Sequence, residues 1–284
     1  MTGPQATVLP DGRLHLNHGP IDLIIGASGS DMAKRAAYSR AVARFDGLLE
    51  ELVAELPALR SPEPQPLNGP IAHAMAAAVA PHRPAFITPM AAVAGAVADA
   101  VLAALSGEGI SRAYVNNGGD IALHLGPGES FTAAIAARPG AVDRLTIRHA
   151  DPVRGIATSG WRGRSFSLGI ADAVTVLAAS AALADTSATM IANAVDLPGH
   201  PAITRRAARE LQADSDLGDR RVTCAVGPLT PAEIALALDR GEAVARALLA
   251  RKLIAGAALF LHPETRTPGR MPLALAQPAE PCLG

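Results

Sequence analysis

The sequence predicts an α+β fold, in which short strands pair in sheets and long helices pack on them. Within residues 12–26, apolar and polar side chains alternate before a turn at Asn17–Pro20, and an apolar run follows the turn. This pattern is typical of a β-hairpin. Residues 31–56 carry apolar side chains at helical spacing, which predicts one long amphipathic helix. Residues 130–171 favour several strands with turns between them.

The remaining elements follow from the same signals. The prolines between Pro57 and Pro66 end the first long helix. Helices are expected over 70–80, 90–106 (with Gly107 as C-cap), 181–195, 201–212 and 231–250, and 82–89 is extended. Strands are expected at Tyr114–Val115, from the turn Asn116–Asp120 through Leu125, and over 173–178, 219–227 and 253–262.

One helix start has a specific local reason. Thr230 can cap the helix, Pro231 fits its first position, and Glu233 can reach back to the cap amide. We predict one domain over residues 1–262, with its last third as a candidate second lobe. A proline-rich and loosely ordered tail follows over 263–284.

Composition excludes some classes of function. The 284 residues carry a net charge of −1 without a basic run, and aromatic residues make up 3%, which argues against nucleic acid as a partner. The two cysteines, Cys224 and Cys282, lie far apart, which fits a reducing compartment. The start of the chain lacks a signal-peptide pattern, and the Ala-rich segments are too short and polar to span a membrane. We therefore expect a cytoplasmic protein.

The first candidate site is a turn that combines amide side chains, two glycines and an acid. It consists of Asn116, Asn117, Gly118, Gly119 and Asp120. Glycines allow positive φ and close approach of a ligand, and exposed amides can hold phosphate oxygens or the edge of a heteroaromatic ring. The alternative interpretation is a simple hairpin turn.

The second candidate site is the segment Gly155–Arg164. It offers the hydroxyls of Thr158 and Ser159, the flexible Gly160, and two arginines, a combination that suits a pyrophosphate. A polar turn without a ligand is the alternative.

The third candidate site lies on the expected helix over 181–195. Asp185 and Thr189 share one face, which Asn193 continues, among apolar neighbours. A carboxylate there is costly unless it is paired or binds a metal, and these hard oxygen ligands suit Mg²⁺. The alternative is a solvated polar stripe. The small residues of the helix start at 88–96 permit close packing against a ligand or another helix.

The order and spacing of these segments resemble the ApbE-like (FAD:protein FMN transferase-like) superfamily, and more closely its uncharacterised, transferase-related branch. The resemblance covers roughly residues 80–230 and is carried by four phrases. They are PMAAVAGAVAD (89–99), VNNGGDIAL (115–123), IATSGWRGRSFSLGIADAVTVLA (156–178) and SDLG (215–218).

This resemblance implies a T-fold-like α+β architecture, with FAD held across the turn at 116–120 and the Thr158–Gly160 turn. It implies a divalent metal, Mg²⁺, held by Asp185, Thr189 and the backbone carbonyl of Ala92. In such transferases the metal stabilises charge on the breaking phosphoanhydride while FMN passes to a protein Thr or Ser, so Asp185 is the expected catalytic residue.

Two departures from the transferase pattern bear on the transfer step. Ala94–Ala96 lacks the Lys of an Ala-Lys-Gly phrase, and Ser167–Asp172 stands where a His-x-x-Asp-Pro-Arg-Thr-Gly phrase is usual, keeping only the Asp. His149–Pro152 precedes the Ser-Gly turn with different spacing, and we expect it to be a loop.

Three functions therefore stay open. The first is an enzyme that binds FAD (or FMN) with Mg²⁺ and cleaves FAD at the pyrophosphate, with transfer to a protein acceptor. The second is a non-catalytic flavin-binding or flavin-delivery protein that serves a partner flavoprotein. The third is a T-fold-type enzyme that acts on another small heterocycle. The Ala-rich helix faces also fit a homodimer.

Overall fold

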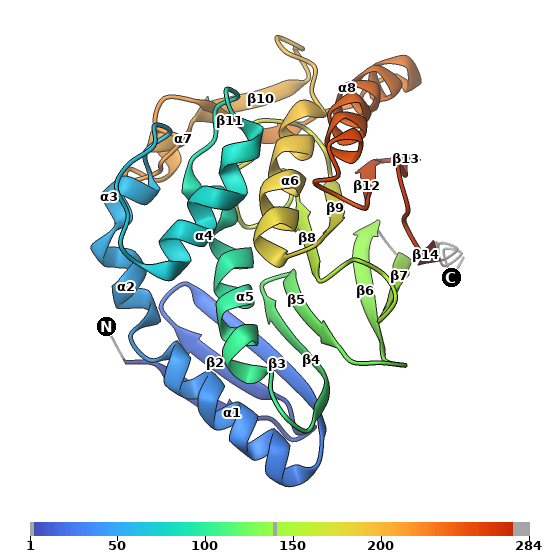
Figure 1. The fold of residues 1–284 in the computed structure, drawn as a ribbon. Helices are drawn as coiled ribbons and strands as arrows, with labels where there is room; N and C mark the ends of the chain where they lie inside the picture. Colours follow the sequence, from blue (N-terminus) through green and yellow to red (C-terminus); the bar gives the residue numbers. More distant parts are fainter. Residues whose placement is uncertain (1–2, 139–140, 275–284) are drawn as a thin grey trace, which may run out of the picture.

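The computed structural model describes residues 3–138 and 141–274, and its largest element is a nine-stranded antiparallel sheet (Figure 1). In spatial order its strands are β1 (Gln5–Val8), β2 (Leu14–His18), β3 (Ile21–Gly29), β4 (Ile110–Asn117), β5 (Asp120–Leu125), β8 (Gly155–Ser159), β9 (Ala173–Ala178), β12 (Gly256–Leu261) and β13 (Glu264–Arg266). Every neighbouring pair is antiparallel.

Two smaller sheets accompany the large one. The first contains β6 (Ser130–Arg138), β7 (Ala141–Arg148) and β14 (Leu273–Ala274), and the second pairs β10 (Ile203–Ala207) with β11 (Arg221–Val226). Side chains of β6 and β7 pack on those of β5 and β8 in one buried cluster. The three-stranded sheet therefore covers part of one face of the large sheet.

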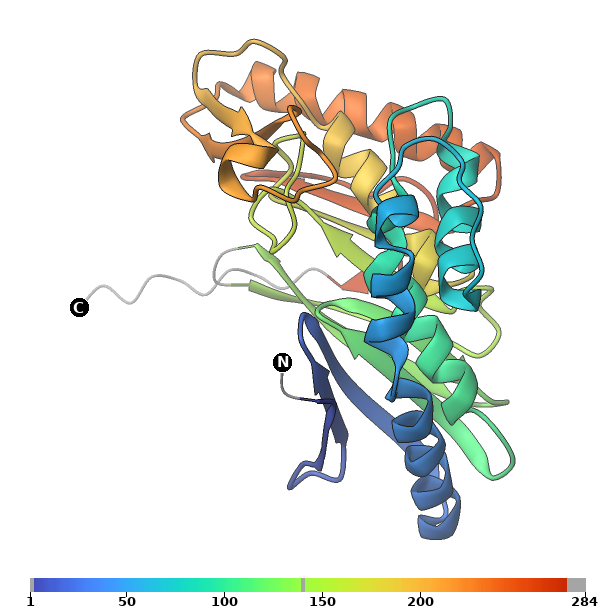
Figure 2. The ribbon, with the colours of Figure 1, turned by 90° about the vertical axis from the view of Figure 1, so that its left-hand side faces the viewer.

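Helices cover the other face (Figures 1 and 2). They are α1 (Asp31–Phe45), α2 (Leu48–Ala54), α3 (Leu56–Leu59), α4 (Pro70–Val79), α5 (Val93–Leu105), α6 (Ala181–Ala194) and α8 (Pro231–Ala250). The short helix α7 (Ala208–Leu211) instead packs beside β10 of the two-stranded sheet. The 3-10 turns Ala80–His82 and Pro89–Ala92 connect α4 to α5. Among the described residues, none of these helices is both long and apolar enough to cross a membrane.

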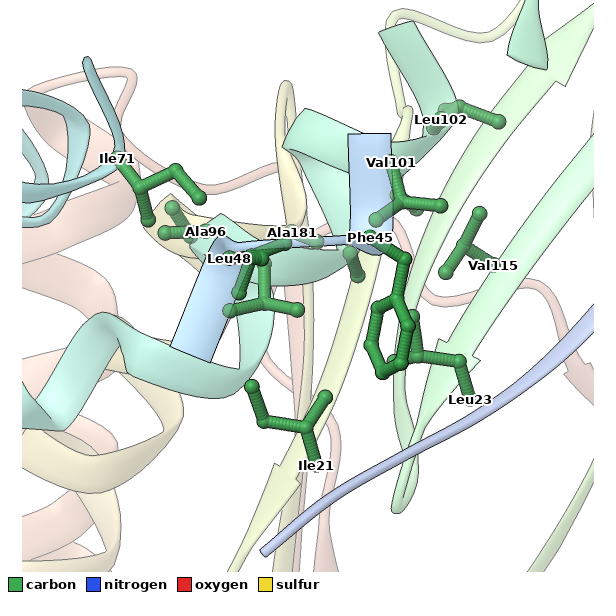
Figure 3. Close-up of a cluster of buried hydrophobic side chains, with 14 of the residues drawn as sticks. Ile21, Leu23, Phe45, Leu48, Ile71, Ala96, Val101, Leu102, Val115 and Ala181 are labelled. Carbon is green, nitrogen blue, oxygen red and sulfur yellow. The ribbon is translucent and has the colours of Figure 1, made fainter. Parts of the chain in front are cut away.

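Two apolar clusters hold the helices to the sheet. In the first, Phe45 and Leu48 from α1 and α2 meet Leu23 of β3, Val101 of α5 and Val115 of β4 (Figure 3). Along β2 and β3 the buried side chains alternate with half-buried ones, because one face is covered by helices. In the second cluster α6 and α8 pack on β9 and β12, which are buried along their whole length.

This architecture confirms the α+β class with long helices packed on antiparallel sheets. The hairpin at 12–26, the helices over 70–80 and 181–195, and the strand over 173–178 are confirmed within a few residues. The capping box at the start of α8 is also confirmed. The Thr230 Oγ1 accepts from the Glu233 N–H, and the Glu233 carboxylate accepts from the Thr230 N–H at 2.7 Å.

Four local expectations were wrong. The helix over 31–56 is broken, because Gly47 has a φ of 73° and separates α1 from α2. Residues 201–212 are not one helix, since 203–207 pair with β11 and only α7 follows. Helix α5 ends at Leu105 with Ser106 as its C-cap, and the positive φ lies at Gly109 rather than Gly107. The segment after residue 262 contains β13 and β14, whereas 275–284 lie outside the described residues.

Candidate functional site

A cavity of about 700 Å³ opens where β4, β5 and β8 approach the start of α5 and the middle of α6. Below it is called the carboxylate cavity. Its walls include all five residues of the 116–120 turn, together with Thr158, Ser159, Gly160, Asp185 and Thr189. Three candidate sites that lie far apart in the sequence therefore share one cavity, of a volume common for small-molecule sites.

The turn between β4 and β5 needs both of its glycines. Gly118 and Gly119 have φ values of 65° and 116°, which side chains rarely adopt. The Gly119 N–H donates to the Asn116 Oδ1 at 2.8 Å, and the Asn117 Nδ2 donates to the Ala94 carbonyl at 3.1 Å. The hairpin interpretation is correct for the backbone, and the same turn also lines the cavity.

The loop after β8 brings one arginine to this turn. A Cβ on Gly118 would overlap the Arg164 guanidinium, so the lack of a side chain at Gly118 lets Arg164 lie against the turn. Arg162 instead pairs with Asp172 at 2.6 Å and lies over the Trp161 ring, with its Cζ 4.5 Å from the ring centroid. Only one of the two guanidiniums is thus directed at the 116–120 turn.

Helices α5 and α6 hold each other through reciprocal carboxylate contacts near their starts. Asp99 of α5 accepts from the Ala181 and Ala182 N–H groups at 3.0 and 2.9 Å. Asp185 of α6 accepts from the Gly95 N–H at 3.0 Å. A Cβ on Gly95 would lie 2.3 Å from the Ala181 carbonyl oxygen, so the two backbones meet there. Each carboxylate accepts from N–H groups at a helix start, where negative charge is stabilising.

The carboxylates of the cavity have perturbed electrostatics. Burial raises the pKa of Asp120 to about 7, against the lowering effects of the Thr158 N–H and of Arg164. Burial, followed by the neighbouring charge of Asp120, raises the pKa of Asp185 well above its usual value. Two neighbouring carboxylates in a partly buried cavity wall are costly to ionise. A bound cation would therefore stabilise their charged forms.

The structure separates some predicted residues from the cavity. Ala92 is completely buried and is not among the cavity-lining residues, whereas Ala94 from the same helix start is. Asn193 does not extend the face of Asp185 and Thr189 into the cavity, because its Oδ1 accepts from the Leu168 N–H at 2.9 Å. His149 lies in a turn and contacts the Leu125 carbonyl at 2.6 Å, so the loop expected at 149–152 is confirmed.

Sequence reasoning missed two contributions to this region. The β6 residues 133–135 form a wall of the cavity, which no local motif indicates. Asp99 fixes the start of α6, and its signal was an acid inside a strongly apolar helix. Among the described residues, no group of three or more His, Cys, Asp or Glu could hold a metal ion.

Comparison with known proteins identifies the family. The family model described as "AbpE bacteria" matches residues 6–271. A UPF0280 protein of Methanothermobacter thermautotrophicus is 34% identical over 202 residues, which cover 68% of this chain and 71% of that protein. A UPF0280 protein of Methanothrix thermoacetophila is 39% identical over 113 residues, covering 38% of this chain. The match spans about half, 46%, of that relative.

A solved structure is also similar over most of its length. The apo flavinyl transferase ApbE of Pseudomonas stutzeri aligns with a TM-score of 0.49 and 13% identity, covering 94% of this chain and 95% of that one. At this score the family rests on the sequence match and not on the superposition. The chain therefore belongs to the AbpE bacteria family, within the ApbE-like superfamily that its motifs resemble.

Proposed function

We propose that this protein binds FAD together with Mg²⁺ in the carboxylate cavity. The observation that carries the proposal is the pair Asp120 and Asp185, two half-buried acids that line one cavity together with hydroxyls and backbone amides, where the charge of Asp120 adds to the raised pKa of Asp185. Membership of the ApbE-like superfamily supports flavin as the ligand.

The donor set fits Mg²⁺. Asp185 and Asp120 supply carboxylates and Thr189 supplies a hydroxyl, while Mg²⁺ in proteins commonly takes one or two carboxylates and completes its shell with waters and phosphate oxygens. This mode of binding does not require a cluster of three protein acids. Because Ala94 and not Ala92 lines the cavity, we assign any backbone carbonyl ligand to Ala94.

The polar wall fits a nucleotide pyrophosphate. Backbone amides in the 116–120 turn and the Thr158–Gly160 segment can donate to phosphate oxygens, and Arg164 adds a positive charge beside the turn. Mg²⁺, when bound, would stabilise negative charge on the phosphoanhydride. Asp185 and Asp120 would then be held ionised, and the turn would orient the phosphates.

Cleavage of FAD into FMN and AMP, with the FMN passing to water or to a protein hydroxyl, is the activity we assign to this geometry. The second candidate is flavin binding or delivery to a partner flavoprotein without cleavage, and one observation favours it. Asp172, the acid kept from the transferase phrase, is held by Arg162 at 2.6 Å and by the His262 N–H at 2.8 Å. A carboxylate held on both oxygens is a poor general base.

The test is FAD affinity with and without Mg²⁺, measured by calorimetry for the wild type and Asp185→Asn. We expect the substitution to weaken Mg²⁺-dependent FAD binding about tenfold or more, because a neutral amide is a poor ligand for this cation. Asp239→Asn, on the exposed side of α8, is the matched control and should bind as the wild type does. Equal affinity of Asp185→Asn and wild type would contradict the metal assignment.

The same samples separate the two candidates. Chromatography of FAD incubated with protein and Mg²⁺ shows FMN and AMP if the protein cleaves, and intact FAD if it only binds. If the wild-type protein binds no FAD either with or without Mg²⁺, both candidate functions are contradicted. Mass spectrometry of the ligand retained on purification would then identify another heterocycle.

A further inference from the structure

A second chamber adjoins the carboxylate cavity on the face of the large sheet that the helices leave open. This side chamber, of about 620 Å³, lies between β3 and β4 on one side and β6 on the other. Asn116, Ile121, Ala133 and Ala134 line both spaces. A ligand held in one can therefore extend into the other.

The floor of the side chamber is built around Tyr114. Tyr114 of β4 stands opposite Gly26 of β3, and a Cβ on Gly26 would lie 2.3 Å from the Tyr114 Cε1. The missing side chain at Gly26 thus lets the half-buried tyrosine ring lie across the neighbouring strand. Phe131 of β6 adjoins it, with ring centroids 5.1 Å apart and planes at 49°.

These rings are scarce in this protein. The whole chain has two tyrosines, five phenylalanines and one tryptophan, and two of these eight aromatic side chains meet in the side chamber. An aromatic face beside apolar neighbours such as Ile24 is a surface on which a planar ring can stack.

Two arginines border this surface, and each has an acidic neighbour. Arg13 pairs with Asp11 at 2.7 Å, and Tyr114, after Asp11, contributes to raising the pKa of the Arg13 guanidinium. Arg112 donates to the Ser130 carbonyl at 3.1 Å and lies 3.9 Å from Glu129. Local charge is therefore nearly balanced. A ring edge with carbonyl or ring-nitrogen acceptors fits these donors better than a phosphate does.

We infer that the side chamber binds the planar ring of the flavin, with Tyr114 as the stacking surface and Gly26 as the residue that makes room for it. The inference rests on the proposed function, because the ring would belong to the nucleotide whose phosphates lie in the carboxylate cavity. Riboflavin, which has the ring without phosphates, and ADP, which has the phosphates without the ring, separate the two spaces.

The experiment measures riboflavin binding by quenching of flavin fluorescence, and binding of ADP with Mg²⁺ by calorimetry. Tyr114→Leu keeps apolar bulk but removes the ring, so we expect about tenfold weaker riboflavin binding with unchanged ADP affinity. Tyr114→Phe keeps the ring and should bind riboflavin within about threefold of the wild type. Tyr38→Leu, at the only other tyrosine, is the control and should change neither.

The outcomes distinguish this inference from the proposed function. Equal riboflavin affinity of wild type and Tyr114→Leu, or no riboflavin binding by the wild type, would overturn the side chamber as a ring site. Failure of the wild type to bind FAD would instead remove the proposed function. Riboflavin binding that is lost in Tyr114→Leu would still support the chamber. Gly26→Ala displaces the tyrosine ring without removing it, and should weaken riboflavin binding if Tyr114→Leu fails to fold.

Discussion

His82 ends the 3-10 turn that follows α4, with 7% of its surface exposed. Its Nε2 has no hydrogen-bond partner among the described residues. Burial, and then the charge of Arg251, lowers the pKa of His82 from 6.5 to about 4. Between about pH 6.5 and pH 4, His82 is therefore protonated in the unfolded chain but neutral in the folded protein. The stability that is present above about pH 6.5 is lost as the pH falls towards 4.

We expect the titration of His82 to lower the free energy of unfolding by about 1–3 kcal/mol when the pH is reduced from about 7 to 4.5. Urea unfolding of wild type and His82→Gln at both pH values measures it, since glutamine does not titrate. His73→Gln, at an exposed histidine of α4, should keep the wild-type pH dependence. If His82→Gln loses as much free energy of unfolding between the two pH values as the wild type does, groups other than His82 cause the pH dependence.

Among the elements, α6 depends most directly on another helix for its start. The Ser180 side chain accepts from the Leu183 N–H, and Asp99 on α5 accepts from the N–H groups of Ala181 and Ala182. By contrast, α8 supplies its own cap through Thr230 and Glu233. Since α6 carries Asp185 and Thr189, its position also sets the geometry of the carboxylate cavity.

Asp99→Ala and Thr230→Ala test this difference. Both should lower the free energy of unfolding, by about 1–3 kcal/mol for Asp99 and about 1 kcal/mol for Thr230, because each leaves N–H groups of a first turn without an acceptor. Only Asp99→Ala should also weaken FAD binding in Mg²⁺. Denaturant unfolding and calorimetry on the same samples measure both effects, and equal FAD affinity in the two variants would contradict the link.

At the scale of the whole molecule, we expect the carboxylate cavity to make the free energy of unfolding depend on pH and on cations. The pKa of Asp120 is raised to about 7 in the folded protein, so its favourable contribution is complete below the unfolded value of 3.8 and is lost as the pH rises through 7. This window lies above the one governed by His82. A cation between Asp120 and Asp185 would remove the cost of ionising them.

We therefore expect the melting temperature without Mg²⁺ to fall between about pH 6 and pH 8, and Mg²⁺ to raise it more at pH 8 than at pH 6. Thermal unfolding in buffers matched for ionic strength with NaCl measures both effects. Asp185→Asn should lose the Mg²⁺ response. An identical Mg²⁺ shift at both pH values would mean that binding does not involve these titrating acids.

How much the sequence predicts depends on the range of the interactions concerned. The 116–120 turn and the capping box at Thr230 were predicted correctly because they depend on residues a few positions apart. The strand at 203–207 was predicted as a helix because its conformation depends on pairing with β11, which no local pattern contains.

The same distinction applies to the site. Motif order alone brought Asn116, Asp120, Thr158, Asp185 and Thr189 into one hypothesis, and all of them line one cavity. The place of Ala94 rather than Ala92 in the cavity wall, the contact of Arg164 with Gly118 and the position of the Tyr114 ring over Gly26 follow only from the tertiary structure.

The sequence by itself determined the classes of chemistry available: carboxylates, hydroxyls and flexible amides at the ends of strands and on one helix face. Only the tertiary structure decided which of these groups share a low-dielectric wall. Charge coupling between Asp120 and Asp185 depends on distance and burial, and both are set by how α5, α6 and the sheet pack together.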